Sequence, residues 1–180
     1  MNHSKNLIHL VSPFLIVIAA VLLRLAPHEP NVAPIGAMAL FGGATLSKRY
    51  ALVVPLIVMF ISDLFLGFHS TMFWVYGSFV LIGLLGVMLR NKVNFGTVLI
   101  SSVLASILFF LVTNFGVWVQ GGMYQANLNG LLQSYIMGLP FFRNTLSGDL
   151  FFNAIFFGGF ALIKSWSNKY VPVTVSNYQK

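Results

Sequence analysis

Long apolar runs separated by short polar segments dominate this chain. The runs occupy 7–25, 33–46, 51–67, 72–89, 96–118 and 145–166. A helix needs about 20 apolar residues, within a range near 17–25, to cross the hydrocarbon core of a bilayer, and only the second run is short for this. The runs do not alternate apolar and polar residues, as the strands of a membrane barrel would. The pattern therefore predicts an all-α integral membrane protein, a bundle of six transmembrane helices in one domain over 1–180.

Two further segments need an interpretation. The stretch NLNGLLQSYIMGLPFF, which begins at Asn127, is only half apolar. It predicts a separate interfacial helix over 127–139, or a re-entrant segment, before the last span. The first run resembles a signal peptide in hydrophobicity, but the RLAPHEP that follows offers no small-residue cleavage site. We therefore expect an uncleaved first span.

Composition and charge support a membrane location and give the bundle an orientation. Hydrophobic residues make up 58% of the chain and charged residues 7%, against about 25% charged residues in soluble domains. The basic residues stand singly or in pairs between apolar runs, which is typical of topology signals in membrane loops and not of a nucleic-acid-binding patch. If both termini are cytoplasmic, the cytoplasmic side holds eight of the ten basic residues: Lys5, Lys48, Arg49, Arg90, Lys92, Lys164, Lys169 and Lys180. We therefore predict cytoplasmic termini and no nucleic-acid partner.

The opposite, outer side of this bundle then collects a balanced set of charges. All three acids of the chain fall there, together with the two remaining arginines. Charged side chains at membrane depth usually pair with one another or face a cavity. The sequence therefore predicts a polar pocket near the outer face. Its candidate residues are Arg24, His28, Glu29, Asn31, Asp63, Tyr76, Asn114, Arg143, Asn144 and Asp149.

Two of these charged residues also have a purely structural interpretation. Arg24, at the end of the first span, could extend its charged end to the interface. Asp63 is as well explained by a buried ion pair with Arg24 or Arg143 as by contact with a ligand.

Prolines and small residues shape the segment that leads into the second span. Pro27, Pro30 and Pro34 fix their own φ angles and favour extended conformations before them, so the loop should be irregular but stiff. The residues after them carry small side chains at helical spacing, which lets helix backbones approach closely. This set is Gly36, Ala39, Gly42 and Gly43. It predicts either a packing face within the bundle or a docking face for a partner.

No sequence motif indicates a particular catalytic chemistry. Zinc-protease, nucleophile-elbow, P-loop and dinucleotide-binding signatures are absent, and the chain has no cysteine for disulfides or thiolate-bound metal. We assign no catalytic residue, metal or cofactor. A membrane transport protein is the leading interpretation. The alternatives are a metal-assisted membrane enzyme that uses His28, Asp63 and His69, and a structural subunit of a membrane complex.

Five sequence blocks between Arg24 and Phe157 resemble a known group of proteins. The blocks are RLAPHEPNVAPIGAMALFGGA, FISDLFLGF, FWVYGSF, LFFLVTNFGVW and PFFRNTLSGDLFF. They resemble a family of small bacterial membrane proteins similar to the substrate-binding S components of energy-coupling-factor vitamin transporters. The chain is most similar to the solitary cobalamin-transporting type.

This resemblance carries expectations about fold, ligand and partners. It implies a six-helix bundle in the bacterial cytoplasmic membrane, with a vitamin-like ligand bound near the outer face. It also implies an energy-coupling membrane subunit with ATPases as a partner. His28, Asp63 and Arg143 match the His, Asp and Arg of the cobalamin type. That type can use a cysteine on cobalt, whereas this chain has Tyr76 near that position. A corrinoid is therefore expected only as a transported ligand.

Overall fold

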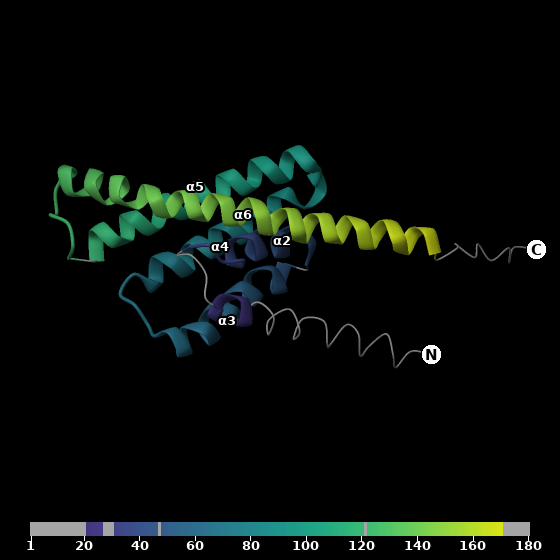
Figure 1. Cartoon of the computed structure of the whole chain (residues 1–180), viewed down its shortest axis with the longest axis horizontal. Helices are drawn as coiled ribbons and strands as arrows, with labels where there is room; N and C mark the ends of the chain where they lie inside the picture. The colour runs from purple at the N-terminus through teal and green to yellow at the C-terminus, as the bar shows by residue number, and fades with distance from the viewer. Residues whose placement is uncertain (1–20, 27–30, 47, 121, 171–180) are drawn as a thin grey trace, which may run out of the picture.

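The structure, a computed structural model of the whole chain, describes residues 21–26, 31–46, 48–120 and 122–170. All regular secondary structure in these ranges is helical (Figure 1). Residues 21–25 are helical and lead to the labelled elements. These are α2 (Ile35–Thr45), α3 (Lys48–Leu66), α4 (Met72–Leu89), the 3-10 helix η1 (Arg90–Lys92), α5 (Phe95–Gln120) and α6 (Leu128–Tyr170).

The predicted helices at 33–46, 51–67, 72–89 and 96–118 correspond to α2, α3, α4 and α5, whose ends lie within three residues of the predicted ones. Local capping explains two of the starts. Ahead of α5, Asn94 and Thr97 each accept a hydrogen bond from the other's backbone N–H at 3.0 Å. Ahead of α6, Asn127 accepts one from the Gly130 N–H at 2.8 Å. Most of the first predicted helix, 7–25, lies outside the described residues.

The last part of the chain differs from the prediction. The segments 127–139 and 145–166 are not separate, because α6 runs without interruption through Pro140 over 43 residues. A proline inside a helix removes one backbone hydrogen bond and favours a break. Here both halves of α6 pack on the same neighbour, α5: the Tyr135 hydroxyl donates to the Leu111 carbonyl before the proline, and Phe142 contacts Phe110 after it. Packing along a common partner therefore outweighs the local preference.

The short helix α2 lies at the centre of the molecule, in contact with α3, α4, α5 and α6. Its eleven residues would extend only about 16 Å, about half a hydrocarbon core. At its closest contact, Gly43 lies against Gly86 of α4, and a side-chain carbon on either glycine would overlap the other helix. Gly36, Ala39 and Gly42 are also buried. The small-residue face is therefore a packing face within the chain, which leaves it unavailable to a partner protein.

The exterior is strongly apolar. Within the described ranges, three helices are long and apolar enough to cross a membrane: Met72–Lys92, Phe95–Gln120 and Leu128–Leu162. Large apolar side chains face outward from them, such as Phe73, Phe95 and Leu162, which are 74%, 86% and 64% exposed. Figure 1 shows α5 and α6 running lengthwise beside each other. The fold therefore supports the prediction of an all-helical membrane protein at the level of helix length and hydrophobicity.

Candidate functional site

A buried cluster of an arginine, an aspartate and a tyrosine joins the helical residues 21–25 to α3 and α4. The Arg24 guanidinium donates to Asp63 Oδ1 at 2.7 Å, to the Met59 carbonyl at 3.3 Å and to the Ser62 hydroxyl. The Tyr76 hydroxyl donates to Asp63 Oδ2 at 2.8 Å. Asp63 is only 1% exposed. Of the sequence-based alternatives for Asp63, the structure thus bears out the buried pair with Arg24.

The second buried carboxylate, Asp149 of α6, lies at the N-terminus of α2. Its Oδ2 lies 2.7 Å from the Ser106 hydroxyl of α5, and the Ala37 backbone N–H donates to its carboxylate. Pro34, the N-cap of α2, has no side-chain capping bond of its own. Asp149 therefore supplies, from another helix, the acceptor that an N-cap residue normally provides. Gly36 leaves the space, because a side-chain carbon there would overlap Asp149 Oδ1.

Arg24 and Asp149 both line a cavity of about 440 Å³. The helical residues 21–25 and helices α2 to α6 all contribute to its wall, and apolar side chains form most of it. The lining residues are Arg24, Leu25, Ala26, Asn31, Ala33, Ile35, Gly36, Met59, Leu66, His69, Val75, Phe79, Ile82, Phe109, Thr145 and Asp149.

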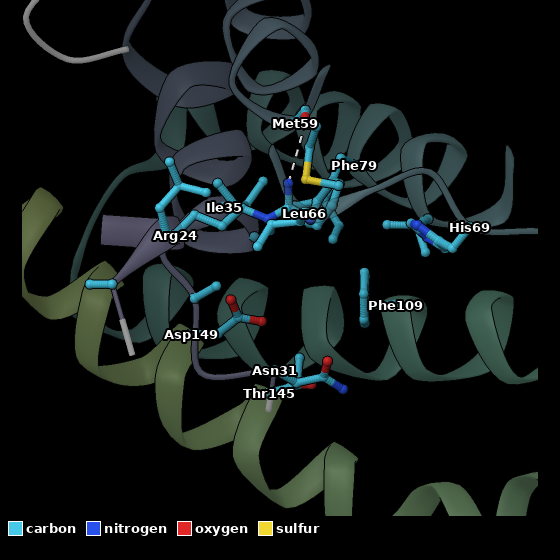
Figure 2. A pocket seen from close by; sticks show the side chains of 16 residues that line it. Arg24, Asn31, Ile35, Met59, Leu66, His69, Phe79, Phe109, Thr145 and Asp149 are labelled. Carbon is cyan, nitrogen blue, oxygen red and sulfur yellow. Dashed lines mark hydrogen bonds between the residues drawn. The ribbon is translucent and has the colours of Figure 1, made fainter. Parts of the chain in front are cut away.

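Figure 2 shows how the polar groups are distributed around this cavity. Asp149 and Thr145 project from α6 beside Asn31, while Arg24 and His69 lie across from them. The dashed line joins the Arg24 guanidinium to the Met59 carbonyl. Phe79 and Phe109 add an aromatic wall, with ring centroids 5.3 Å apart. The site is therefore an apolar chamber with polar groups at a few places, which is the usual character of a small-molecule pocket.

The structure brings together part of the predicted site and separates the rest. Arg24, Asn31 and Asp149 line the cavity. Asp63 forms the ion pair with Arg24, and Tyr76 donates a hydrogen bond to Asp63. Asp63 and Tyr76 do not line the cavity themselves, and among the other described residues of the predicted site Asn114, Arg143 and Asn144 do not line it either. His28 and Glu29 lie outside the described residues.

Arg143 and Asn114 differ from the prediction for identifiable reasons. Arg143 is exposed on the surface of α6, because the uninterrupted helix turns its side chain away from the bundle. Asn114 donates to the Phe110 carbonyl at 2.8 Å, and its amide lies against Gly138 where α5 meets α6.

Sequence reasoning did not select several residues of the site. Phe79 and Phe109 are apolar residues within apolar runs, so only the tertiary structure distinguishes them from lipid-facing phenylalanines. Thr145 could have been found by spacing, because Thr145, Asp149 and Asn153 recur every fourth residue and share one face of α6. All three are buried, and neither polar atom of the Asn153 amide has a hydrogen-bond partner.

The metal-assisted alternative finds no support in the described part of the chain. No group of three metal-ligating side chains comes together there. Asp63 is instead held by Arg24 and Tyr76, and His69 lies in the loop between α3 and α4.

Comparison with known proteins places the chain in a family. A family model described as a family of unknown function, DUF6580, matches residues 4–172. The chain belongs to this family. The match spans every residue of the cavity and every described helix. Comparison with curated proteins and with solved structures found no match. Family membership brings no activity or ligand with it.

Proposed function

We propose that this protein is a multi-pass protein of the bacterial cytoplasmic membrane that binds a small, vitamin-like molecule in the cavity. It would act as a transport protein or as the substrate-binding subunit of a transporter. The observation that carries the proposal is the cavity of about 440 Å³, to which the helical residues 21–25 and helices α2 to α6 contribute. Small-molecule sites typically occupy roughly 300–1,000 Å³ and are mostly apolar, with a few placed polar groups.

The buried charges give independent support. Burying an ion pair among membrane helices costs desolvation energy and contributes little to stability by itself. Here a hydrogen-bonded Arg24–Asp63 pair and the separate Asp149 are held around an open space. Buried charged side chains are expected where they contact a ligand, because apolar side chains of similar size would stabilise a purely structural core at least as well.

The size of the cavity favours a compact ligand. A corrinoid is considerably larger than a cavity of this volume, so a smaller vitamin-like molecule is the better fit. The sequence resemblance to S components suggests that an energy-coupling subunit with ATPases assists transport. No nucleotide-binding motif occurs in the chain that would let it use ATP directly.

A cavity-filling substitution tests the proposal directly. Ala33 lines the cavity, so Ala33→Phe should occupy part of it and reduce ligand binding. Ala154 is exposed on the surface of α6, and Ala154→Phe makes the same chemical change on the surface as a matched control. Each protein is purified in nanodiscs, incubated with a mixture of vitamins and related metabolites, and examined by native mass spectrometry.

The expected result is a small molecule retained by wild type and by Ala154→Phe, and lost in Ala33→Phe. Thermal unfolding of all three proteins shows whether Ala33→Phe remains folded. Equal retention in Ala33→Phe and wild type would place the binding site elsewhere. Absence of any bound small molecule in wild type would contradict the proposal.

A further inference from the structure

The charges of the cavity are not equivalent. The charged and titratable side chains described in its wall are Arg24, His69 and Asp149, with Asp63 and Tyr76 behind Arg24. Arg24 and Asp63 form an ion pair and compensate each other. Asp149 has no ionic partner among the described residues, and its neighbours from α2 and α5 are the Ala37 N–H and the Ser106 hydroxyl.

The hydrogen bonds of Ser106 indicate the state of Asp149 when no ligand is present. Ser106 Oγ lies 2.7 Å from Asp149 Oδ2 and 3.1 Å from the Ser102 carbonyl. A carbonyl oxygen only accepts, and a serine hydroxyl has a single hydrogen to donate. Both contacts are full hydrogen bonds if Asp149 carries a proton and donates it to Ser106, which then donates to Ser102. A neutral acid also avoids the cost of an unpaired charge among apolar helices.

We infer that the cavity selects a ligand with a positively charged amine, whose cation takes the place of the proton on Asp149. This inference rests on the proposed function and names the class of its ligand. Binding breaks the Asp149 O–H bond, the proton leaves to solvent, and the amine cation pairs with the resulting carboxylate. The net charge of the protein–ligand complex is then the same as that of the empty protein.

The remainder of the wall suits the same ligand. Phe79 and Phe109 place two aromatic rings in the wall, and aromatic rings can attract cations as well as apolar groups. The apolar wall accommodates a hydrocarbon or aromatic body. An anionic group, in contrast, would meet Asp149 and could pair with Arg24 only by competing with Asp63.

Three compounds with similar bodies test the inference: 2-phenylethylamine, 2-phenylethanol and 3-phenylpropionate. Binding to the full chain in nanodiscs is measured by calorimetry at pH 6 in two buffers with different enthalpies of ionisation, which reports protons released. The amine remains protonated at this pH, so any proton released comes from the protein. We expect the amine to bind at least about tenfold more tightly than the alcohol, and to release a proton that the alcohol does not.

Two variants test whether Asp149 is responsible for the amine preference and for the proton release. Asp149→Asn preserves the shape of the side chain without its charge, and should abolish both the amine preference and the proton release. Ser147→Ala changes an exposed residue of α6 that does not line the cavity, and should leave both unchanged. If Asp149→Asn does not fold, proton release that persists in His69→Gln still tests the inference, because His69 is the other wall residue that could supply the proton.

The outcomes separate this inference from the proposed function. If the alcohol or the propionate binds as tightly as the amine, or if the amine binds without releasing a proton, the inference is wrong while the cavity remains a binding site. An amine preference that persists in folded Asp149→Asn also overturns it. If none of the three compounds binds and the metabolite mixture also yields no ligand, both fail together.

Discussion

At the residue scale, the two buried aspartates differ in whether a positive charge lies beside them. Asp63 meets a guanidinium and a phenol hydroxyl, so both of its oxygens are satisfied and its charge is compensated. Asp149 meets a hydroxyl and a backbone N–H, which satisfy its oxygens without a full positive charge. The first environment suits a permanent structural ion pair. The second suits a carboxyl group whose charge can change when a partner arrives.

The Arg24 cluster leads to a prediction about stability. Asp63→Asn should lower the free energy of unfolding by about 1.5–3 kcal/mol, because the Arg24 guanidinium would lose its 2.7 Å charge-assisted hydrogen bond to the Asp63 carboxylate. Tyr76→Phe removes one hydrogen bond from the same carboxylate and should cost only about 1 kcal/mol. Arg143→Gln, at an exposed position, serves as the control and should change little. Denaturant unfolding in detergent measures all three, and an Asp63→Asn protein as stable as wild type would contradict the ion-pair role.

At the scale of elements, α2 depends on its neighbours for its existence. Its three glycines disfavour a helix by up to about 1 kcal/mol each relative to alanine, and it has no side-chain cap of its own. Asp149 binds its N-terminus, and the Arg90 guanidinium donates to the Gly43 and Leu46 carbonyls at the other end. Asp149 accepts a hydrogen bond from a free backbone N–H at the N-terminus, and the Arg90 cation at the C-terminus complements the helix dipole. The two ends of α2 are therefore held by residues of α6 and η1.

Two glycines of α4 provide a matched test of this packing. Gly86→Ala should destabilise the protein by about 1–3 kcal/mol, because the added methyl group would overlap the α2 backbone at Leu40 and Gly43. A side-chain carbon on Gly77 meets nothing within 4 Å, so Gly77→Ala should be neutral or stabilise α4 by up to about 1 kcal/mol. Thermal unfolding of both variants gives the comparison. Equal effects at the two positions would mean that the close approach of α2 and α4 is not important for stability.

At the scale of the whole molecule, the exterior is as apolar as the core, and the core also holds polar side chains. Large apolar side chains cover the outside, while serines, an asparagine and carboxylates are buried. Contiguous apolar surface on this scale requires lipid or protein around it. The loops alternate between the two ends of the bundle, so His69 and Asn91 lie before and after the same helix, α4. If α4 spans the membrane, these loops lie on opposite sides of it.

The absence of native cysteine makes this topology directly measurable. Single substitutions Ser70→Cys and Asn91→Cys place a thiol at exposed positions before and after α4. In intact cells, a membrane-impermeant thiol reagent should label Ser70→Cys, because the positive-inside rule places this loop outside. Asn91→Cys, next to Arg90 and Lys92, should be labelled only after the cells are permeabilised. The reverse pattern would invert the proposed orientation and place the α3–α4 loop in the cytoplasm.

The sequence by itself determined the class of this protein and most of its helices. The apolar runs are long, and a run of this length indicates a helix because about 20 apolar residues are needed for a helix to cross the hydrocarbon core. They located α2 to α5 within three residues, and the distribution of lysine and arginine gave an orientation to test. The polar exceptions also pointed to Arg24, Asp63 and Asp149 as residues that needed partners, since charges among apolar helices are expensive alone.

Only the tertiary structure decided which partners they have. Arg24 lies 39 residues before Asp63, and Ser106 lies 43 residues before Asp149, so no local pattern could pair them. Tertiary packing likewise joined 127–139 to the last helix through Pro140, turned Arg143 outward and brought Phe79 and Phe109 into one wall. A sequence pattern indicates whether each segment favours a helix and whether that helix favours a lipid environment. The cavity arises from how the helices pack, which depends on contacts between residues far apart in the chain.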